Sequence, residues 1–170
     1  SKVVDTPVLA ALKEKGLEPA PLCSDEVFVR RVYLDVIGTL PGPHDVLDFL
    51  QDRRTGKRAA LIDALLKRTE FADYWAMKWG DTLRIKAEFP INLWQNGAMV
   101  YHRWIRDALL ENKPYDVFAR ELLTSSGSNF REPPVNFYRA AQGRDANSLA
   151  EAVALTFMGT RLDSWPEDRR

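Results

Sequence analysis

The residue types that most often bind metals or carry out catalysis are scarce in this sequence. Cys23 is the only cysteine, and His44 and His102 are the only histidines. A structural zinc site needs several converging Cys or His ligands, and a covalently attached haem needs two thiols and an axial donor such as an imidazole. The two histidines also fall on different predicted helices. We therefore expect no metal site and no cofactor.

Acidic residues are frequent enough to supply the pair of carboxyl groups that hydrolyses a glycosidic bond. Their spacing does not show which two would face each other across a cleft. Serine chemistry has less support, because Ser125, Ser126 and Ser128 lack the strand–turn–helix context of an activated nucleophile. The sequence favours a non-catalytic domain over the alternative, a carboxylate-based hydrolase acting on polysaccharide. Acidic candidates for such a pair include Asp73, Asp81, Glu88, Asp107 and Asp116.

The long irregular segment at residues 125–139 carries the best candidates for binding. It places Asn129, Arg131 and Asn136 beside the rings of Phe130, Phe137 and Tyr138. Amides next to aromatic rings suit a sugar or a peptide, and loops on a helical scaffold often carry recognition. Trp94 joins this site if its ring is exposed. The sequence favours a structural cover over such a site, with the rings filling the core, the amides bonding to the backbone and Trp94 buried.

The charge balance excludes several classes of partner. The chain has 24 Lys and Arg residues and 24 Asp and Glu residues, so no net field attracts nucleic acid or an anionic membrane. It contains no apolar run near 18 residues, so we expect no membrane insertion by these residues. No hydrophobic export signal is present, and localisation cannot be read from composition.

An all-α fold is indicated by the hydrophobic periodicity, with seven or eight short helices in a single compact bundle. Four of the five tryptophans lie between residues 75 and 104. Phe71, Trp75, Trp79 and Leu83 recur at helical spacing, which predicts an aromatic core between two consecutive helices. A strand is the alternative for residues 27–37, where apolar residues partly alternate.

Capping residues predict where most helices begin and end. Ser24 and Gly38 bracket one helix, Pro43 starts the next, and Thr69 begins the first tryptophan helix. Other expected starts are Thr6 with Pro7, Thr55, Asn92 and either Asp145 or Asn147. Further expected stops are Gly16, Pro90 and Gly159.

Several motifs in fixed order resemble the second type of planctomycete cytochrome domain, a bacterial domain family of unknown function. The first is Phe-Val-Arg-Arg-Val-Tyr-Leu-Asp-Val-Ile-Gly-Thr-Leu-Pro at residues 28–41. Further similar blocks occupy residues 63–66, 71–75, 79–84, 101–107 and 112–118. The likeness covers about residues 24–162. It implies an exported bacterial protein, usually with a cytochrome c-like domain before this region and another uncharacterised domain after it.

One departure from this family concerns haem. Many members follow the block found here at residues 157–162 with Cys-x-x-Cys-His, the attachment motif for covalent haem. In this chain the block is followed by Asp-Ser-Trp-Pro at residues 163–166. The chain therefore lacks the thiols and the imidazole that the motif supplies.

Together these observations predict one helical domain over residues 1–170. Its parts are an arm with a short helix at 1–22, a family-like core at 24–162 and a truncated C-terminal segment at 163–170. We expect a non-catalytic interaction or scaffold domain, periplasmic or extracellular, that docks to neighbouring domains such as a cytochrome c-like domain. Polysaccharide binding and the positioning of a haem-bearing redox partner are alternatives.

Overall fold

The computed structural model describes residues 2–87, 93–141, 143 and 145–162, and contains no strand within them. The all-α prediction is confirmed, and the alternative strand at residues 27–37 is a helix. Two short elements accompany the α-helices, a 3₁₀ turn at Pro133–Val135 and a π-helical turn at Ala154–Met158. The described ranges contain nine α-helices: α1 (Lys2–Glu14), α2 (Asp25–Ile37), α3 (Pro43–Gln51), α4 (Lys57–Leu65), α5 (Thr69–Thr82), α6 (Gln95–Leu110), α7 (Tyr115–Thr124), α8 (Asn136–Ala140) and α9 (Ala146–Val153).

Most predicted helix ends are confirmed, because capping chemistry is local. Ser24 is the N-cap of α2, and Gly38 ends that helix in the left-handed conformation at φ 71°. Pro43 is the first residue of α3. The Asp145 carboxylate accepts a hydrogen bond from the Ser148 amide at 3.0 Å, which caps α9. Gly159 ends the last turn at φ 63°.

Three predicted helix starts differ from the structure. α1 begins at Lys2, so Pro7 lies inside the helix, where it removes one backbone hydrogen bond. α4 begins after Gly56 and not after the predicted cap Thr55. The φ of Gly56 is 87°, a conformation that favours glycine. The second tryptophan helix has Trp94 as its N-cap, and the predicted cap Asn92 lies outside the described residues. The extra helix α8 forms within the segment expected to be irregular.

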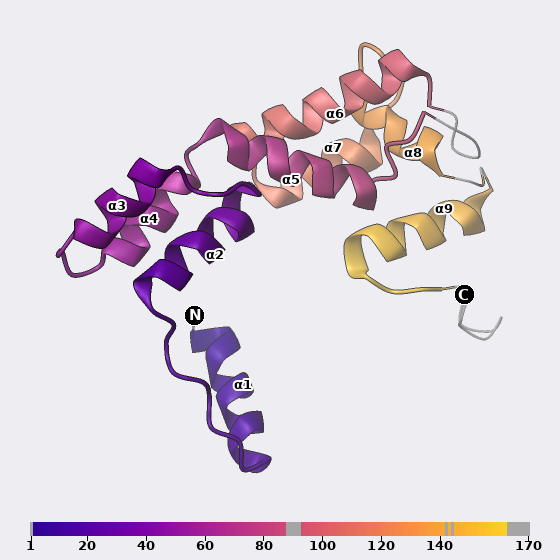
Figure 1. Ribbon diagram of the computed structural model, residues 1–170. Helices are drawn as coiled ribbons and strands as arrows, with labels where there is room; N and C mark the ends of the chain where they lie inside the picture. Colours follow the sequence, from indigo (N-terminus) through magenta and orange to yellow (C-terminus); the bar gives the residue numbers. More distant parts are fainter. Residues whose placement is uncertain (1, 88–92, 142, 144, 163–170) are drawn as a thin grey trace.

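Helices α5 and α6 form the centre of the molecule, side by side and in opposite directions (Figure 1). Residues of α2, α3 and α4 pack together at one end, with Phe71 of α5 against them. A second cluster joins α5 and α6 to Phe118 of α7 and Phe137 of α8. The tryptophan helices thus connect two apolar clusters.

Small residues, rather than tryptophan rings, line the contact between α5 and α6. Ala72 and Ala76 are fully buried on α5, and Ala76 packs in the cluster that holds Tyr101 and Ile105 of α6. Two helices approach closely only where side chains are short, which explains why the tryptophans occupy the flanks of this contact.

The partly buried rings tie α5 to its other neighbours. The Trp75 indole donates to the Val36 carbonyl at 3.1 Å, and the Trp79 ring lies 5.3 Å from the Phe118 ring. The aromatic cluster is therefore present, with its tryptophans bridging between helices instead of filling the central contact.

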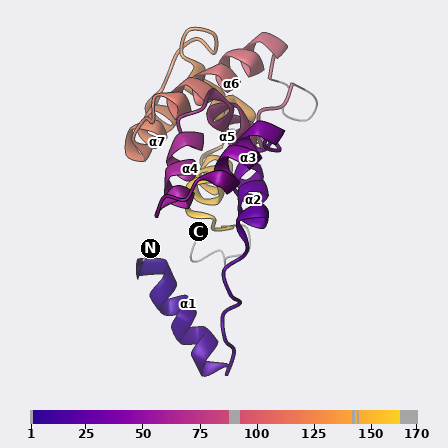
Figure 2. The ribbon, with the colours of Figure 1, turned by 60° about the vertical axis from the view of Figure 1, so that its left-hand side comes forward.

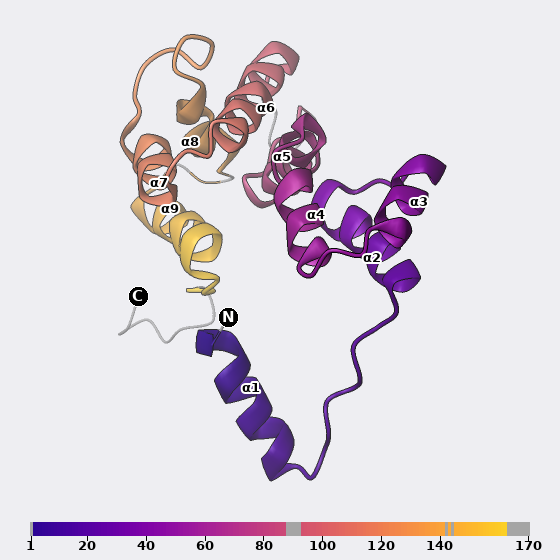
Figure 3. The ribbon, with the colours of Figure 1, turned by 90° about the vertical axis from the view of Figure 1, so that its left-hand side faces the viewer.

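Helix α1 stands apart from the rest of the fold. None of its residues is buried, and Figures 2 and 3 show it separated from α2 by the extended segment that joins them. No helix in the described part of the chain is long and apolar enough to span a membrane.

Candidate functional site

The start of α6 presents an exposed aromatic pair. Trp94 is 75% exposed, and its ring lies 6.5 Å from the Phe130 ring in an edge-to-face arrangement. Phe130 is itself 43% exposed. Trp94 thus lies against the 125–139 segment with its ring exposed, which is the condition for a shared site.

Asn136 holds the 125–139 segment in its folded shape. Its side chain is fully buried, and its amide nitrogen donates to the Asn129 carbonyl and the Pro133 carbonyl, both at 2.9 Å. Further along, the Tyr138 hydroxyl donates to the Leu123 carbonyl at 2.8 Å. These bonds fix the backbone that carries Phe130.

Gly97 allows this segment to approach α6. A Cβ atom at this position would lie 3.0 Å from the side-chain nitrogen of Asn129 and 3.6 Å from the side-chain oxygen of Asn136. Gly97 is buried within α6, where glycine is otherwise unfavourable. Gly97 was not predicted as a site residue, although a glycine one turn before Tyr101 in an amphipathic helix is a sign of close packing.

The four residues predicted to bind a ligand therefore occupy different environments. Trp94 and Arg131 are exposed, and Asn129 is half-buried. Asn136 lies beneath the surface, so its side chain supports the site without reaching a ligand. Phe130 provides the second exposed ring of the site. The binding role of these residues remains a prediction.

The ionisable groups resemble structural ion pairs. Arg54 holds the pKa of Asp52 at about 2, and Arg68 lowers the pKa of Glu70 to about 2. Lys57 and Arg58 lower the pKa of Asp25 and link the starts of α2 and α4. Among the described carboxyl groups, every resolved pKa shift is downward, whereas a glycosidase acid needs a raised pKa.

One depression of about 290 Å³ between α3 and α4 is lined by Asp45, Asp48 and Asp52. Two of these carboxylates already serve the backbone: Asp45 accepts from the Gly42 amide at 3.0 Å, and Asp52 accepts from the Arg54 amide at 2.9 Å. Asp45 belongs to the capping box of α3, and Asp52 stabilises the turn that follows this helix. No group of three or more His, Cys, Asp and Glu residues in the described ranges is placed to hold a metal ion.

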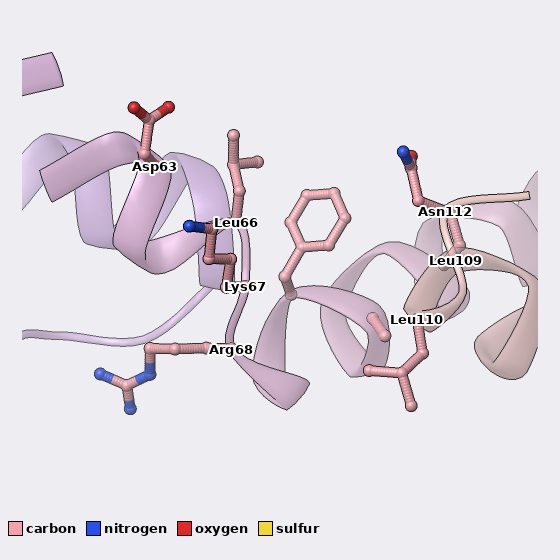
Figure 4. Close-up of a pocket in the computed structure, with 9 residues that line it drawn as sticks. Asp63, Leu66, Lys67, Arg68, Leu109, Leu110 and Asn112 are labelled. Atoms are coloured by element: carbon pink, nitrogen blue, oxygen red, sulfur yellow. The ribbon is translucent and has the colours of Figure 1, made fainter. Parts of the chain in front are cut away.

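A larger pocket, of about 530 Å³, lies between the end of α4 and the end of α6. Figure 4 shows Leu66 and Lys67 on one side and Leu109, Leu110 and Asn112 on the other. Its remaining lining residues are Asp63, Arg68, Phe71 and Ala72. The pocket has apolar walls and a polar rim, and it is separate from the aromatic pair.

The chain belongs to the family described as PSCyt2, protein of unknown function (DUF1549), whose model matches residues 3–163. This match confirms the resemblance drawn from the sequence motifs. No curated protein and no solved structure matches the chain. The family description states no activity, and this member carries no Cys-x-x-Cys-His motif.

Proposed function

We propose that this chain is a non-catalytic interaction domain of a larger exported bacterial protein. The observation that carries the proposal is the exposed Trp94–Phe130 pair on a backbone fixed by Asn136. Aromatic rings are enriched at protein interfaces, and rigid rings lose little conformational freedom on binding. The pair is therefore the face through which the domain contacts its partner.

The first candidate partner is a neighbouring domain of the same protein, such as a cytochrome c-like domain. In that case the chain positions a haem that its partner carries. The second candidate is polysaccharide, since Asn129 and Arg131 are the residues on either side of Phe130 in the chain. Rings stack on the apolar faces of sugars, and amide or guanidinium groups bond their hydroxyls.

Hydrolysis is less well supported than binding. The carboxylates with resolved pKa shifts are all stabilised in the charged form; Asp52 pairs with Arg54, and Asp145 caps α9. A carboxylic acid that must donate a proton near neutral pH requires the opposite shift.

A matched pair of variants tests the proposal. Trp94→Ala removes the indole, which is 75% exposed, and Met99→Ala removes an apolar side chain on α6 that is 63% exposed. We expect Trp94→Ala to weaken binding at least ~10-fold, as truncation of an aromatic anchor does, while Met99→Ala binds like the parent protein. Affinities are measured by titration calorimetry with the separately produced flanking domains and with a panel of polysaccharides. Equal binding by both variants would contradict the proposal.

A further inference from the structure

A small pocket between the end of α5 and helix α9 holds two opposite charges that do not pair with each other. Arg84 follows α5, Glu151 belongs to α9, and both line this pocket of about 240 Å³. Both residues are only partly exposed. Neither side chain has an ion-pair or hydrogen-bond partner among the residues that the structure describes. Charges that are withdrawn from water are normally paired, so these two groups are available to a ligand.

The backbone of Arg84 has a conformation that arginine rarely adopts. Its φ is 57°, and it is the one described residue with positive φ that is neither glycine nor asparagine. The Arg84 amide donates to the Asp81 carbonyl at 3.2 Å, and the next amide donates to the Gly80 carbonyl at 2.8 Å. Arg84 therefore occupies the position at a helix end where glycine is usual. Strained residues of this kind cluster at ligand sites, and the side chain of this one lines the pocket.

A second irregular element borders the same pocket. The π-helical turn Ala154–Met158 contributes Leu155 to the lining. Such turns are rare and are often found at functional sites. Ala152 and Leu162 add further apolar lining. The pocket thus combines a cation, an anion and an apolar wall.

The other polar side chains of the pocket are already engaged. The Ser148 hydroxyl donates to the Asp145 carboxylate at 2.6 Å. Arg161 also lines the pocket, and it takes part in an interaction of its own. The unpaired charges of the pocket are therefore one guanidinium and one carboxylate, which together suit a ligand that carries both signs of charge.

We propose that this pocket binds a free, small, apolar α-amino acid. The Arg84 guanidinium pairs with the carboxylate of the ligand, Glu151 pairs with its ammonium group, and its side chain lies against Leu155. A peptide end carries only one of these charges, whereas a free amino acid satisfies both groups at once. The pocket is smaller than the roughly 300–1,000 Å³ of pockets for drug-sized ligands. Trp94 and Phe130 do not line it, so this proposal is independent of the proposed function.

Titration calorimetry with L-leucine and two analogues tests the ligand. Isocaproate has the same side chain without the ammonium group, and isoamylamine has it without the carboxylate. We expect L-leucine to bind and each analogue to bind at least ~10-fold more weakly, because each leaves one charge of the pocket unpaired. No binding of L-leucine, or equal binding of either analogue, overturns the proposal.

Variants that remove one charge test the two residues. Arg84→Gln and Glu151→Gln should each weaken the binding of L-leucine at least ~10-fold. Arg103→Gln is the control, because Arg103 is an exposed residue of α6 outside the pocket; it should bind like the parent protein. Unchanged binding by Arg84→Gln or by Glu151→Gln overturns the proposal.

Arg84→Gly separates a role in binding from a role in the fold. Glycine suits the backbone conformation at this position, so the melting temperature should stay the same or rise while the binding of L-leucine is lost. A clear fall in the melting temperature would show that the arginine supports the fold, and it would contradict the functional explanation of its strained backbone.

Discussion

At the scale of single residues, two buried polar side chains are only partly satisfied. Asn136 donates two hydrogen bonds to backbone carbonyls, but its side-chain oxygen and the Tyr101 hydroxyl have no protein partner among the described residues. The sequence placed Asn129 and Asn136 together as binding residues because both are amides in one irregular segment. Burial separates them, and burial depends on the close approach at Gly97, which local pattern does not show.

Replacing the two amides should therefore have unequal effects. We expect Asn136→Ala to lower the free energy of unfolding by roughly 1–3 kcal/mol, because two carbonyls lose their donor. Asn129→Ala should cost less than about 1 kcal/mol, because the segment uses the backbone oxygen of Asn129. Urea denaturation of both variants measures the difference. The reverse order would show that Asn129 is the structural residue.

Tyr101 makes the stability sensitive to alkaline pH. Burial raises the pKa of its hydroxyl above the ordinary value of 10.0. Above pH 10 the unfolded chain loses this proton while the folded chain keeps it, so the free energy of unfolding falls, by at most about 1.4 kcal/mol per pH unit from this group. Tyr101→Phe should change stability by less than about 1 kcal/mol at pH 7 and reduce the alkaline loss. An unchanged alkaline slope in that variant would show that Tyr101 does not cause it.

At the scale of elements, the ends of the helices could be predicted from the sequence, but the pairs of helices that pack together could not. Gly38, Pro43 and Asp145 act within one turn of the chain, so their roles follow from residue type. The contact between α5 and α6 depends instead on which face of each helix meets the other. Trp75 and Trp79 dominate the pattern of α5 by size, but the short side chains of Ala72 and Ala76 decide the packing.

Gly38, at the end of α2, lies against the Tyr74 ring of α5. The stability cost of adding a methyl group there can be compared with the cost at a second glycine. A Cβ atom at Gly38 would lie 2.2 Å from a ring carbon of Tyr74, whereas one at Gly159 would meet nothing within 4 Å. Both residues have positive φ, at 71° and 63°. We expect Gly159→Ala to cost about 1 kcal/mol for the backbone alone, and Gly38→Ala to cost at least ~1 kcal/mol more in thermal unfolding. Equal costs would mean that the Tyr74 ring moves away freely.

At the scale of the whole molecule, the chain is a helical body with an arm and an exposed aromatic pair. The helical body could be predicted from the sequence, because the apolar residues of its helices recur at helical spacing and pack in two clusters. The sequence predicted the arm at residues 1–22, but it did not show that α1 would lack buried residues. The sequence also favoured burial of Trp94, because large aromatic rings usually lie in a core, whereas the ring is 75% exposed. Export and the surrounding domains remain expectations drawn from the family resemblance.

Nuclear magnetic resonance of the tryptophan indole groups tests the binding face most directly. The chain has five tryptophans, and the Trp94 signal is identified by its loss in Trp94→Ala. On titration with the flanking domains and with polysaccharides, we expect the Trp94 signal to shift first. The Trp75 signal should stay in place, because its indole is bonded to the Val36 carbonyl. Binding that leaves the Trp94 signal unchanged would contradict the account.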